Sequence, residues 1–151
     1  MELHLDGSNV INAPREKVYA LLTDPNFLAR TLPDAENVRV IDASSLEAKL
    51  KLKVAVVSST LRMKMTVTKT EPPTKAILLA EGTGSGSNMK VTSVFTLGGD
   101  LPTTMTWSAD AEITGVMAGL GSTLLRGFAT KKVAEIFAGI TRAVEASTRQ
   151  A

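Results

Sequence analysis

Residues 105–128 read MTWSADAEITGVMAGLGSTLLRGF, and the spacing of the apolar side chains changes within this stretch. Up to Ile113 every second residue is apolar, which is typical of a strand with one buried face. From Leu120 onward the apolar residues follow a helical spacing that continues to Val144. The sequence therefore predicts a strand that passes through a turn at Gly115 into a long C-terminal helix.

The centre of the chain contains further strands of the same kind. Residues 46–54, LEAKLKLKV, alternate without interruption between inward apolar and outward charged side chains, and residues 61–68 repeat this alternation. We expect the two segments to form a hairpin with a two-residue turn at Ser58-Ser59, which places Lys53 opposite Lys64. Additional strands are expected near residues 76–81, 89–97 and 105–113.

The N-terminal part predicts one strand followed by two short helices. Residues 2–11 begin with alternation, and Pro14 suits the first turn of a helix. Pro25 can start a second short helix, which ends before Pro33. The resulting order is one strand, two short helices, about six strands and one long helix.

This order predicts the fold. Antiparallel strands with one apolar face need a cover on that face, and the C-terminal helix is the only element long enough to provide it. We therefore predict an α+β fold in which a curved antiparallel sheet of about seven strands wraps around the C-terminal helix, with two short helices after the first strand. At 151 residues, we expect the chain to be a single domain over residues 1–151.

The composition excludes several classes of function. A formal net charge of +2 without a basic run, together with only 4% aromatic residues, does not favour nucleic-acid binding. The absence of cysteine excludes disulfides, thiol catalysis and cysteine metal sites. The most apolar window, residues 113–128, contains Arg126 and falls short of the roughly 20 residues that a membrane span needs. The N-terminus lacks the pattern of a signal peptide, so we expect a cytoplasmic protein.

The polar residues do not suggest catalysis. The single histidine, His4, shares the outward face of its strand with Glu2, so neither a metal site nor a Ser-His-Asp arrangement is expected. Asp110 and Glu112 also face outward. The glycine-rich segment at residues 81–88 lacks the spacing of a phosphate-binding loop and indicates a hairpin turn. We therefore expect no catalytic residue and no metal ion.

The interior is the main candidate for a binding site. Several methionines beside small residues favour an adaptable cavity over a solid core, although a close-packed core remains the alternative. The residues expected to line the cavity are Leu50, Leu52, Met63, Met65, Phe95, Met105, Trp107, Leu120, Leu124 and Phe128. Those expected at its entrance are Phe27, Val56, Val57, Val116 and Met117.

The outer face of the predicted hairpin is strongly basic. In the expected register Lys53 sits opposite Lys64, which is unfavourable unless a partner neutralises the two charges. An acidic protein or an anionic lipid would do so, whereas ordinary solvation is the alternative. The residues of this candidate partner or membrane surface are Lys49, Lys51, Lys53, Arg62 and Lys64.

The order of elements resembles the helix-grip superfamily, also called SRPBCC, which includes START lipid-transfer domains, the birch pollen allergen and polyketide cyclases. Residues 18–33, VYALLTDPNFLARTLP, are similar to a family pattern of a helix, an Asp and a Leu-Pro. Residues 107–121, WSADAEITGVMAGLG, are similar to the pattern of CoxG, an accessory protein of carbon monoxide dehydrogenase, in which a glycine-containing turn and a Leu-Gly precede the long helix.

This resemblance implies an accessory protein of molybdenum-containing carbon monoxide dehydrogenases, peripheral to the inner face of the cell membrane. Some relatives carry a hydrophobic C-terminal anchor, and none is visible before Ala151. We expect a non-catalytic protein without metal or covalent cofactor that takes an isoprenoid quinone, menaquinone or ubiquinone, from the membrane. The alternatives are a membrane-recruitment adaptor with a solid interior and a small-molecule cyclase or hydrolase of the same fold.

The glycines at the start of the long helix predict where the cavity opens. Gly119 and Gly121 weaken the first turns and remove side-chain bulk where the helix begins to cover the cavity. We expect this end of the helix to be the movable edge of the site, with Val116 and Met117 as an apolar lip.

Overall fold

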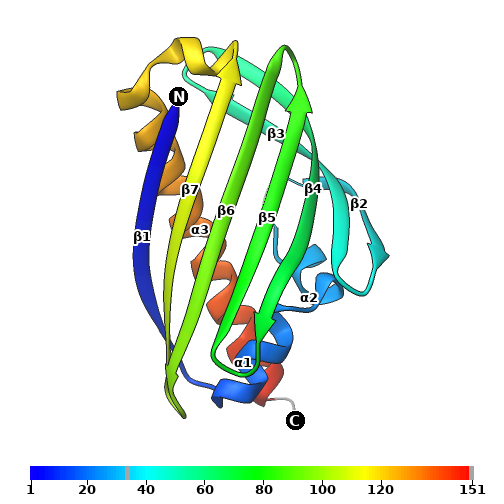
Figure 1. The fold of residues 1–151 in the computed structure, drawn as a ribbon, viewed down its shortest axis with the longest axis vertical. Helices are drawn as coiled ribbons and strands as arrows, with labels where there is room; N and C mark the ends of the chain where they lie inside the picture. Colours follow the sequence, from blue (N-terminus) through cyan, green and yellow to red (C-terminus); the bar gives the residue numbers. More distant parts are fainter. Residues whose placement is uncertain (33–34, 150–151) are drawn as a thin grey trace.

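The computed structural model describes residues 1–32 and 35–149 of the protein. In that part of the chain, seven antiparallel strands form one sheet in the order β1-β7-β6-β5-β4-β3-β2 (Figure 1). The elements are β1 (Glu2–Ile11), α1 (Arg15–Leu22), α2 (Pro25–Ala29), β2 (Ala35–Asp42), β3 (Ser45–Val54), β4 (Val57–Glu71), β5 (Lys75–Gly84), β6 (Ser87–Gly99), β7 (Thr103–Gly115), the 3-10 helix η1 (Met117–Leu120) and α3 (Ser122–Arg149).

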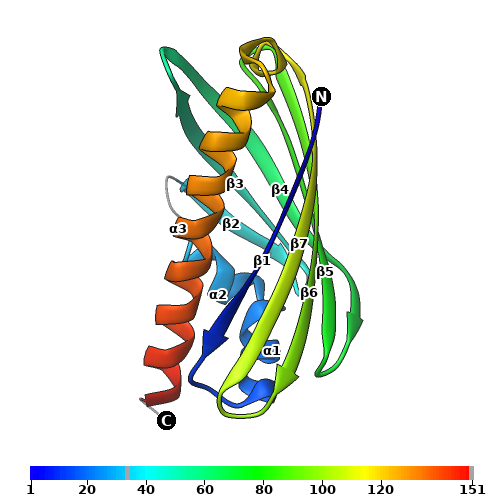
Figure 2. The same cartoon turned by 90° about the vertical axis from the view of Figure 1, so that its left-hand side faces the viewer.

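The sheet is curved, and α3 runs along its concave side from one end of the molecule to the other (Figure 2). The two short helices lie near the C-terminal half of α3. This arrangement confirms the predicted α+β fold, with a curved antiparallel sheet around a long C-terminal helix.

The two short helices begin at prolines in different ways. In α2, Pro25 occupies the first position, and the side chain of Asp24 accepts a hydrogen bond of 2.9 Å from the backbone N–H of Asn26. In α1, by contrast, Pro14 is extended (φ −63°, ψ 146°) and precedes the helix, so its expected place in the first turn is wrong by one residue. Asp100, from the turn after β6, accepts the backbone N–H of Arg15 at 3.0 Å and so caps a helix whose N-cap side chain makes no such bond.

The hairpin of β3 and β4 has a different register from the expected one. Its turn lies at Ala55-Val56, where Ala55 adopts a φ of 55°, and Lys53 pairs with Ser58 rather than with Lys64. Ser59 is buried on the inner face of β4, so a serine that suggested a turn is part of the strand.

The inner faces of the two strands explain why this register is adopted. In the expected register, Leu46 and Ala48 would lie opposite Glu71 and Lys69, whereas in the structure they lie opposite Met65 and Met63. The observed pairing therefore matches apolar residues with apolar residues. Because the shift is an even number of residues, the inward and outward faces stay as predicted.

Charges alternate along a cross-strand row on the outer face of the sheet as a result of this register. From β2 to β1, the row contains Arg39, Glu47, Lys64, Glu81, Lys90, Glu112 and Glu2, and the alternation ends with the last pair. The first two residues form an ion pair of 2.8 Å between Arg39 Nη2 and Glu47 Oε2. We name these seven residues the charge row. Opposite charges on neighbouring strands stabilise a sheet modestly, which accounts for the row without a binding partner.

The connection from β7 to α3 corrects the expected start of the long helix. Gly115 has a φ of 88°, as expected for a strand-to-helix turn. The next residues form η1, and Gly121, with a φ of 90°, separates it from α3. The α-helix therefore begins at Ser122 and not near Val116, which changes the residues that its inner face presents. Leu125 faces the interior, while Leu124 is 47% exposed.

We expect the two glycines Gly115 and Gly119 to differ in their tolerance of alanine. A Cβ at Gly115 would collide with the carbonyl oxygen of Gly86 and would hold an unfavourable positive φ, whereas a Cβ at Gly119 meets nothing within 4 Å. Gly115→Ala should lower the free energy of unfolding by at least about 2 kcal/mol. Gly119→Ala should raise it by about 0.5 kcal/mol, because alanine restricts the unfolded chain. Urea unfolding of both variants measures the difference, and equal midpoints would contradict this account.

Candidate functional site

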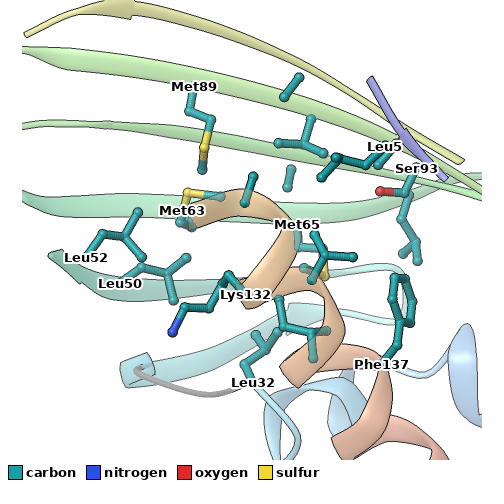
Figure 3. Close-up of a pocket in the computed structure, with 18 of the residues that line it drawn as sticks. Leu5, Leu32, Leu50, Leu52, Met63, Met65, Met89, Ser93, Lys132 and Phe137 are labelled. Carbon is teal, nitrogen blue, oxygen red and sulfur yellow. The ribbon is translucent and has the colours of Figure 1, made fainter. Parts of the chain in front are cut away.

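An apolar cavity of about 240 Å³ lies between the concave side of the sheet and α3 (Figure 3). Each of β3 to β7 contributes inward side chains from its alternating pattern, and α3 contributes one face. Small side chains create much of the space, since five alanines line it: Ala48, Ala80, Ala109, Ala111 and Ala129. Larger apolar residues such as Met63, Met89 and Phe137 complete the wall.

Within the described part of the chain, two polar side chains line the cavity, Ser93 from β6 and Lys132 from α3 (Figure 3). The Lys132 ammonium lies 3.2 Å from a carboxylate oxygen of Glu135 and 5.7 Å from the centre of the Phe128 ring. Its side chain is 23% exposed, so one end of the lysine reaches solvent while its stem contacts the cavity. The site therefore combines an apolar enclosure with a hydroxyl donor from the sheet and, at its edge, an ammonium group from the helix that pairs with Glu135.

Most of the residues expected to line the cavity do so in the structure. Those in the wall are Leu50, Leu52, Met63, Met65, Phe95 and Phe128. Met117, expected at the entrance, also lines the cavity and is only 3% exposed, so it is part of the wall rather than of the lip.

Four other residues expected in the wall lie elsewhere. Met105 is fully buried in the core, toward the other end of β7. Trp107 packs beside the cavity, stacked on Phe137 at 4.6 Å between ring centroids, with its Nε1–H donating to Asn9. Leu120 belongs to η1 and packs against the smaller core cluster, while Leu124 faces solvent because of the phase change at Gly121.

The expected entrance residues divide into two groups. The prediction of Phe27 at the entrance is wrong, since this residue of α2 is 3% exposed and packs in the core. Val56 and Val116 are 93% and 56% exposed, and Val57 is partly buried. The β3–β4 turn and the β7–α3 connection, which carry or adjoin these three valines, lie at the same end of the molecule (Figure 1).

The basic surface is less uniform than its sequence suggests. Lys49 faces Arg62 across the hairpin, which preserves one like-charge pair. Lys51 pairs with Glu36 at 3.2 Å, and Lys64 lies between Glu47 and Glu81 in the charge row. The unfavourable pair expected between Lys53 and Lys64 does not form. The outer face of the hairpin therefore has less need of an acidic partner to neutralise it.

Ser93 and Lys132 were not among the predicted lining residues, although the sequence carries a signal for each. Ser93 shares its strand parity with Val91 and Phe95, which face inward. Lys132 lies midway between Phe128 and Ile136 at four-residue spacing on the inner stripe of α3, where a charge is unusual.

The outward position of His4 is as predicted. Its Nδ1 lies 2.6 Å from an Asp110 carboxylate oxygen and its Nε2 lies 3.1 Å from one of Asp6. These hydrogen bonds, to Asp110 first and Asp6 second, raise the pKa of His4. The histidine and its two acids therefore form a small charged cluster on the solvent side of the sheet.

The raised pKa of His4 predicts a pH dependence of stability. The folded state favours the imidazolium, so this contribution is full below the unfolded pKa of roughly 6.5 and disappears as the pH rises through the higher folded pKa. His4→Gln should therefore lower the urea midpoint at acidic pH and have little effect at alkaline pH. A ring titration by NMR checks the shift directly, and a midpoint difference that grows with pH would contradict the assignment.

Over the part of the chain that the structure describes, no group of three or more His, Cys, Asp or Glu side chains could hold a metal ion. Within residues 1–32 and 35–149, no helix is both long enough and apolar enough to cross a membrane.

Several solved structures share this fold. A conserved protein from Geobacillus kaustophilus is 26% identical, with a TM-score of 0.85 over 96% of this chain and 97% of that one. A START superfamily protein from Mycobacterium smegmatis is 13% identical, with a TM-score of 0.65 over 97% of both chains. The Zhui aromatase/cyclase from Streptomyces sp. R1128 is 13% identical, with a TM-score of 0.67 over 96% and 94%. The last two similarities, at 13% identity, show only that the fold is shared.

The sequence itself identifies the family. Among curated proteins no significant match is found. The family model for CoxG, the G subunit of carbon monoxide dehydrogenase, matches residues 7–145, from β1 to the last turns of α3. This match includes both parts of the chain that line the cavity, the strands and the long helix. The chain therefore belongs to the CoxG family of helix-grip proteins.

Proposed function

We propose that the protein binds a hydrophobic, lipid-like ligand in its cavity, an isoprenoid quinone, and serves carbon monoxide dehydrogenase at the membrane. The observation that carries the first part is the composition of the cavity wall, which is apolar except for Ser93 and Lys132 among the residues that the structure describes. Ligand sites of this kind enclose apolar groups and fix their orientation with few polar contacts.

The two polar groups suit the head of a quinone. A quinone ring presents carbonyl oxygens, which accept hydrogen bonds, while the Ser93 hydroxyl and the Lys132 ammonium can donate them. The isoprenoid tail is a hydrocarbon and gains from contact with the methionine, leucine and alanine side chains. A quinone therefore matches both the polar and the apolar part of the wall.

The size of the cavity sets how a quinone would be held. At about 240 Å³ it lies below the roughly 300–1,000 Å³ of common ligand sites. The ring and the first part of a tail would fill it, and a longer tail would extend out of the cavity or require the wall to move. The methionines Met63, Met65 and Met89 are suited to such adjustment.

The partner follows from the family. The CoxG name supports an association with carbon monoxide dehydrogenase. A soluble redox enzyme that transfers electrons to a lipid-dissolved carrier needs access to that carrier, and a protein that holds one quinone molecule beside the enzyme would supply it. The protein itself acts as a carrier and binding module in this proposal.

Organic extraction of the purified protein followed by mass spectrometry tests the proposal. The extraction is performed on protein as purified and again after mixing with menaquinone-loaded vesicles and reisolation. We expect quinone in at least the second sample, and about two- to tenfold less in Ser93→Ala because one hydrogen bond is lost. The matched control is Ser108→Ala, on the outer face of β7, which should retain the wild-type amount.

If no quinone is recovered from either sample, the proposal of quinone binding is wrong, and the alternative of a membrane-recruitment adaptor remains. Recovery of a different small molecule, together with its chemical conversion by the protein, would favour the cyclase alternative instead.

A further inference from the structure

One end of the molecule brings together three connections that are distant in sequence. They are the β3–β4 turn at residues 54–57, the β5–β6 turn at residues 84–87 and the β7–α3 connection at residues 115–124 (Figure 1). The backbone N–H of Val116 donates to the carbonyl of Gly86 at 3.0 Å, and that of Thr60 donates to the Ser85 hydroxyl at 3.1 Å. We name these three segments the turn end.

The turn end carries exposed apolar side chains. Val56 is 93% exposed, Val116 56% and Leu124 47%, and they come from the first and the third of these segments. All three are aliphatic. The aromatic and arginine side chains that dominate protein interfaces are absent from the described residues 54–57, 84–87 and 115–124. Aliphatic side chains projecting from separate turns can each enter a lipid surface without a shaped partner.

The β3–β4 side of the turn end is positively charged. On this hairpin, Lys51, Lys53 and Arg62 lie between the charge row and the turn; Lys51 pairs with Glu36, while Lys53 faces Ser58. The chain has no Asp or Glu between Glu112 and Glu135, whereas Arg126 lies within that interval. On β5 and β7 the charge row itself lies near the turns and contributes Glu81 and Glu112. The turn end thus combines apolar tips with a basic border on its β3–β4 side.

The turn end also lies next to the cavity. Exposed Val116 is followed directly by buried Met117, which lines the cavity together with Ile113 and Leu125. The segment that carries Val116 and Met117 is bounded by Gly115 and Gly121, both at positive φ. A short apolar path therefore joins the exposed tips to the ligand site.

We propose that the turn end docks on an anionic lipid bilayer, with Val56, Val116 and Leu124 entering the lipid and the basic border facing the headgroups. Each basic residue close to an anionic membrane contributes on the order of 1 kcal/mol to such binding. Three residues of the basic surface predicted from the sequence, Lys51, Lys53 and Arg62, belong to this border, so the proposal moves the membrane contact from the outer face of the hairpin toward its turn. The proposal rests on the proposed function and deepens it, because it names the source from which the quinone would reach the cavity.

Single labelled cysteines test the docking directly. The chain has no cysteine, so Val56→Cys and Val116→Cys each accept one nitrobenzoxadiazole label, whose fluorescence rises and shifts to the blue in lipid. The controls are Val10→Cys and Leu101→Cys, which are 61% and 62% exposed and lie at the opposite end of the molecule. The probe is a quinone-free vesicle of phosphatidylcholine with or without phosphatidylglycerol.

We expect the fluorescence change at the two turn-end positions only, with phosphatidylglycerol vesicles, and smaller at high salt. An unlabelled double variant, Val56→Glu with Val116→Glu, should sediment with these vesicles about tenfold less than wild type. The matched control, Val10→Glu with Leu101→Glu, should sediment as wild type does.

Three results would overturn the docking proposal. They are equal fluorescence changes at both ends, no change with either vesicle, and a change at the turn end on adding carbon monoxide dehydrogenase but not vesicles. Because the vesicles contain no quinone, a failure here is distinct from a failure of quinone binding. If quinone is extracted from a protein that does not bind vesicles, the proposal of quinone binding stands and the proposal of membrane docking through the turn end is wrong.

Discussion

Ala111→Phe should reduce the quinone recovered from the protein by about tenfold or more. Ala111 lies on the inner face of β7, between Leu3 of β1 and Val91 of β6, and lines the cavity. A phenyl ring at this position projects into the 240 Å³ that the ligand would occupy. A loss of about 60 Å² of apolar contact would already weaken binding by roughly tenfold. Extraction and mass spectrometry after loading with menaquinone vesicles measures the effect.

The controls separate loss of the cavity from loss of the fold. Thr106→Phe adds a comparable ring to the exposed outer face of β7 and should retain wild-type binding. Overpacking would lower stability by about 1–3 kcal/mol, which urea unfolding of Ala111→Phe would detect. If Ala111→Phe is destabilised in this way, Ala80→Leu on β5 fills part of the cavity with a smaller side chain. Full quinone recovery from folded Ala111→Phe and Ala80→Leu would show that the ligand binds elsewhere.

Phe137→Ala should produce the largest loss of stability, about 3–5 kcal/mol in the free energy of unfolding. Phe137 is 7% exposed and joins the sheet to α3 through two aromatic contacts. Its ring stacks on Trp107 at 4.6 Å between centroids and meets Phe95 edge to face at 5.6 Å. With only 4% aromatic residues in the chain, this group supplies much of the large-side-chain packing between the two layers.

Urea unfolding followed by circular dichroism measures the loss. Leu124→Ala is the matched control, because it removes a large apolar side chain from an exposed position of the same helix and should change stability by less than about 0.5 kcal/mol. A loss below about 1 kcal/mol for Phe137→Ala would mean that the aromatic group does not hold α3 against the sheet.

The strands and the long helix could be predicted because their periods differ and each period fixes a buried face. The register of β3 and β4 could not, because Ser59 interrupts the apolar alternation on the inner face although it belongs to the strand. Alternation determines which face a residue occupies and leaves its partner open by any even shift. For that reason the lysine face was assigned to the correct side of the sheet and to the wrong neighbours.

The candidate site was predictable to the same extent. Strand parity placed Leu52, Met63 and Phe95 in the wall, but it gives no position along the strand, so Met105 was included although it lies deep in the core. On α3 the phase depended on where the helix starts. Gly121 interrupts it, which moved Leu124 outward and Leu125 inward.

The edge at β1 also affects how the open sheet meets other sheets. Over the described residues the sheet is open, so β1 and β2 are its edge strands. At the β1 edge, the guanidinium of Arg126 from α3 donates to the carbonyl oxygen of His4 at 3.0 Å, so a further strand would have to displace this contact. If two copies joined through antiparallel β1 strands, the acids Glu2 and Asp6 would also be brought toward those of the second copy, and like charges on adjoining strands repel. We expect both features to disfavour strand addition between molecules at this edge.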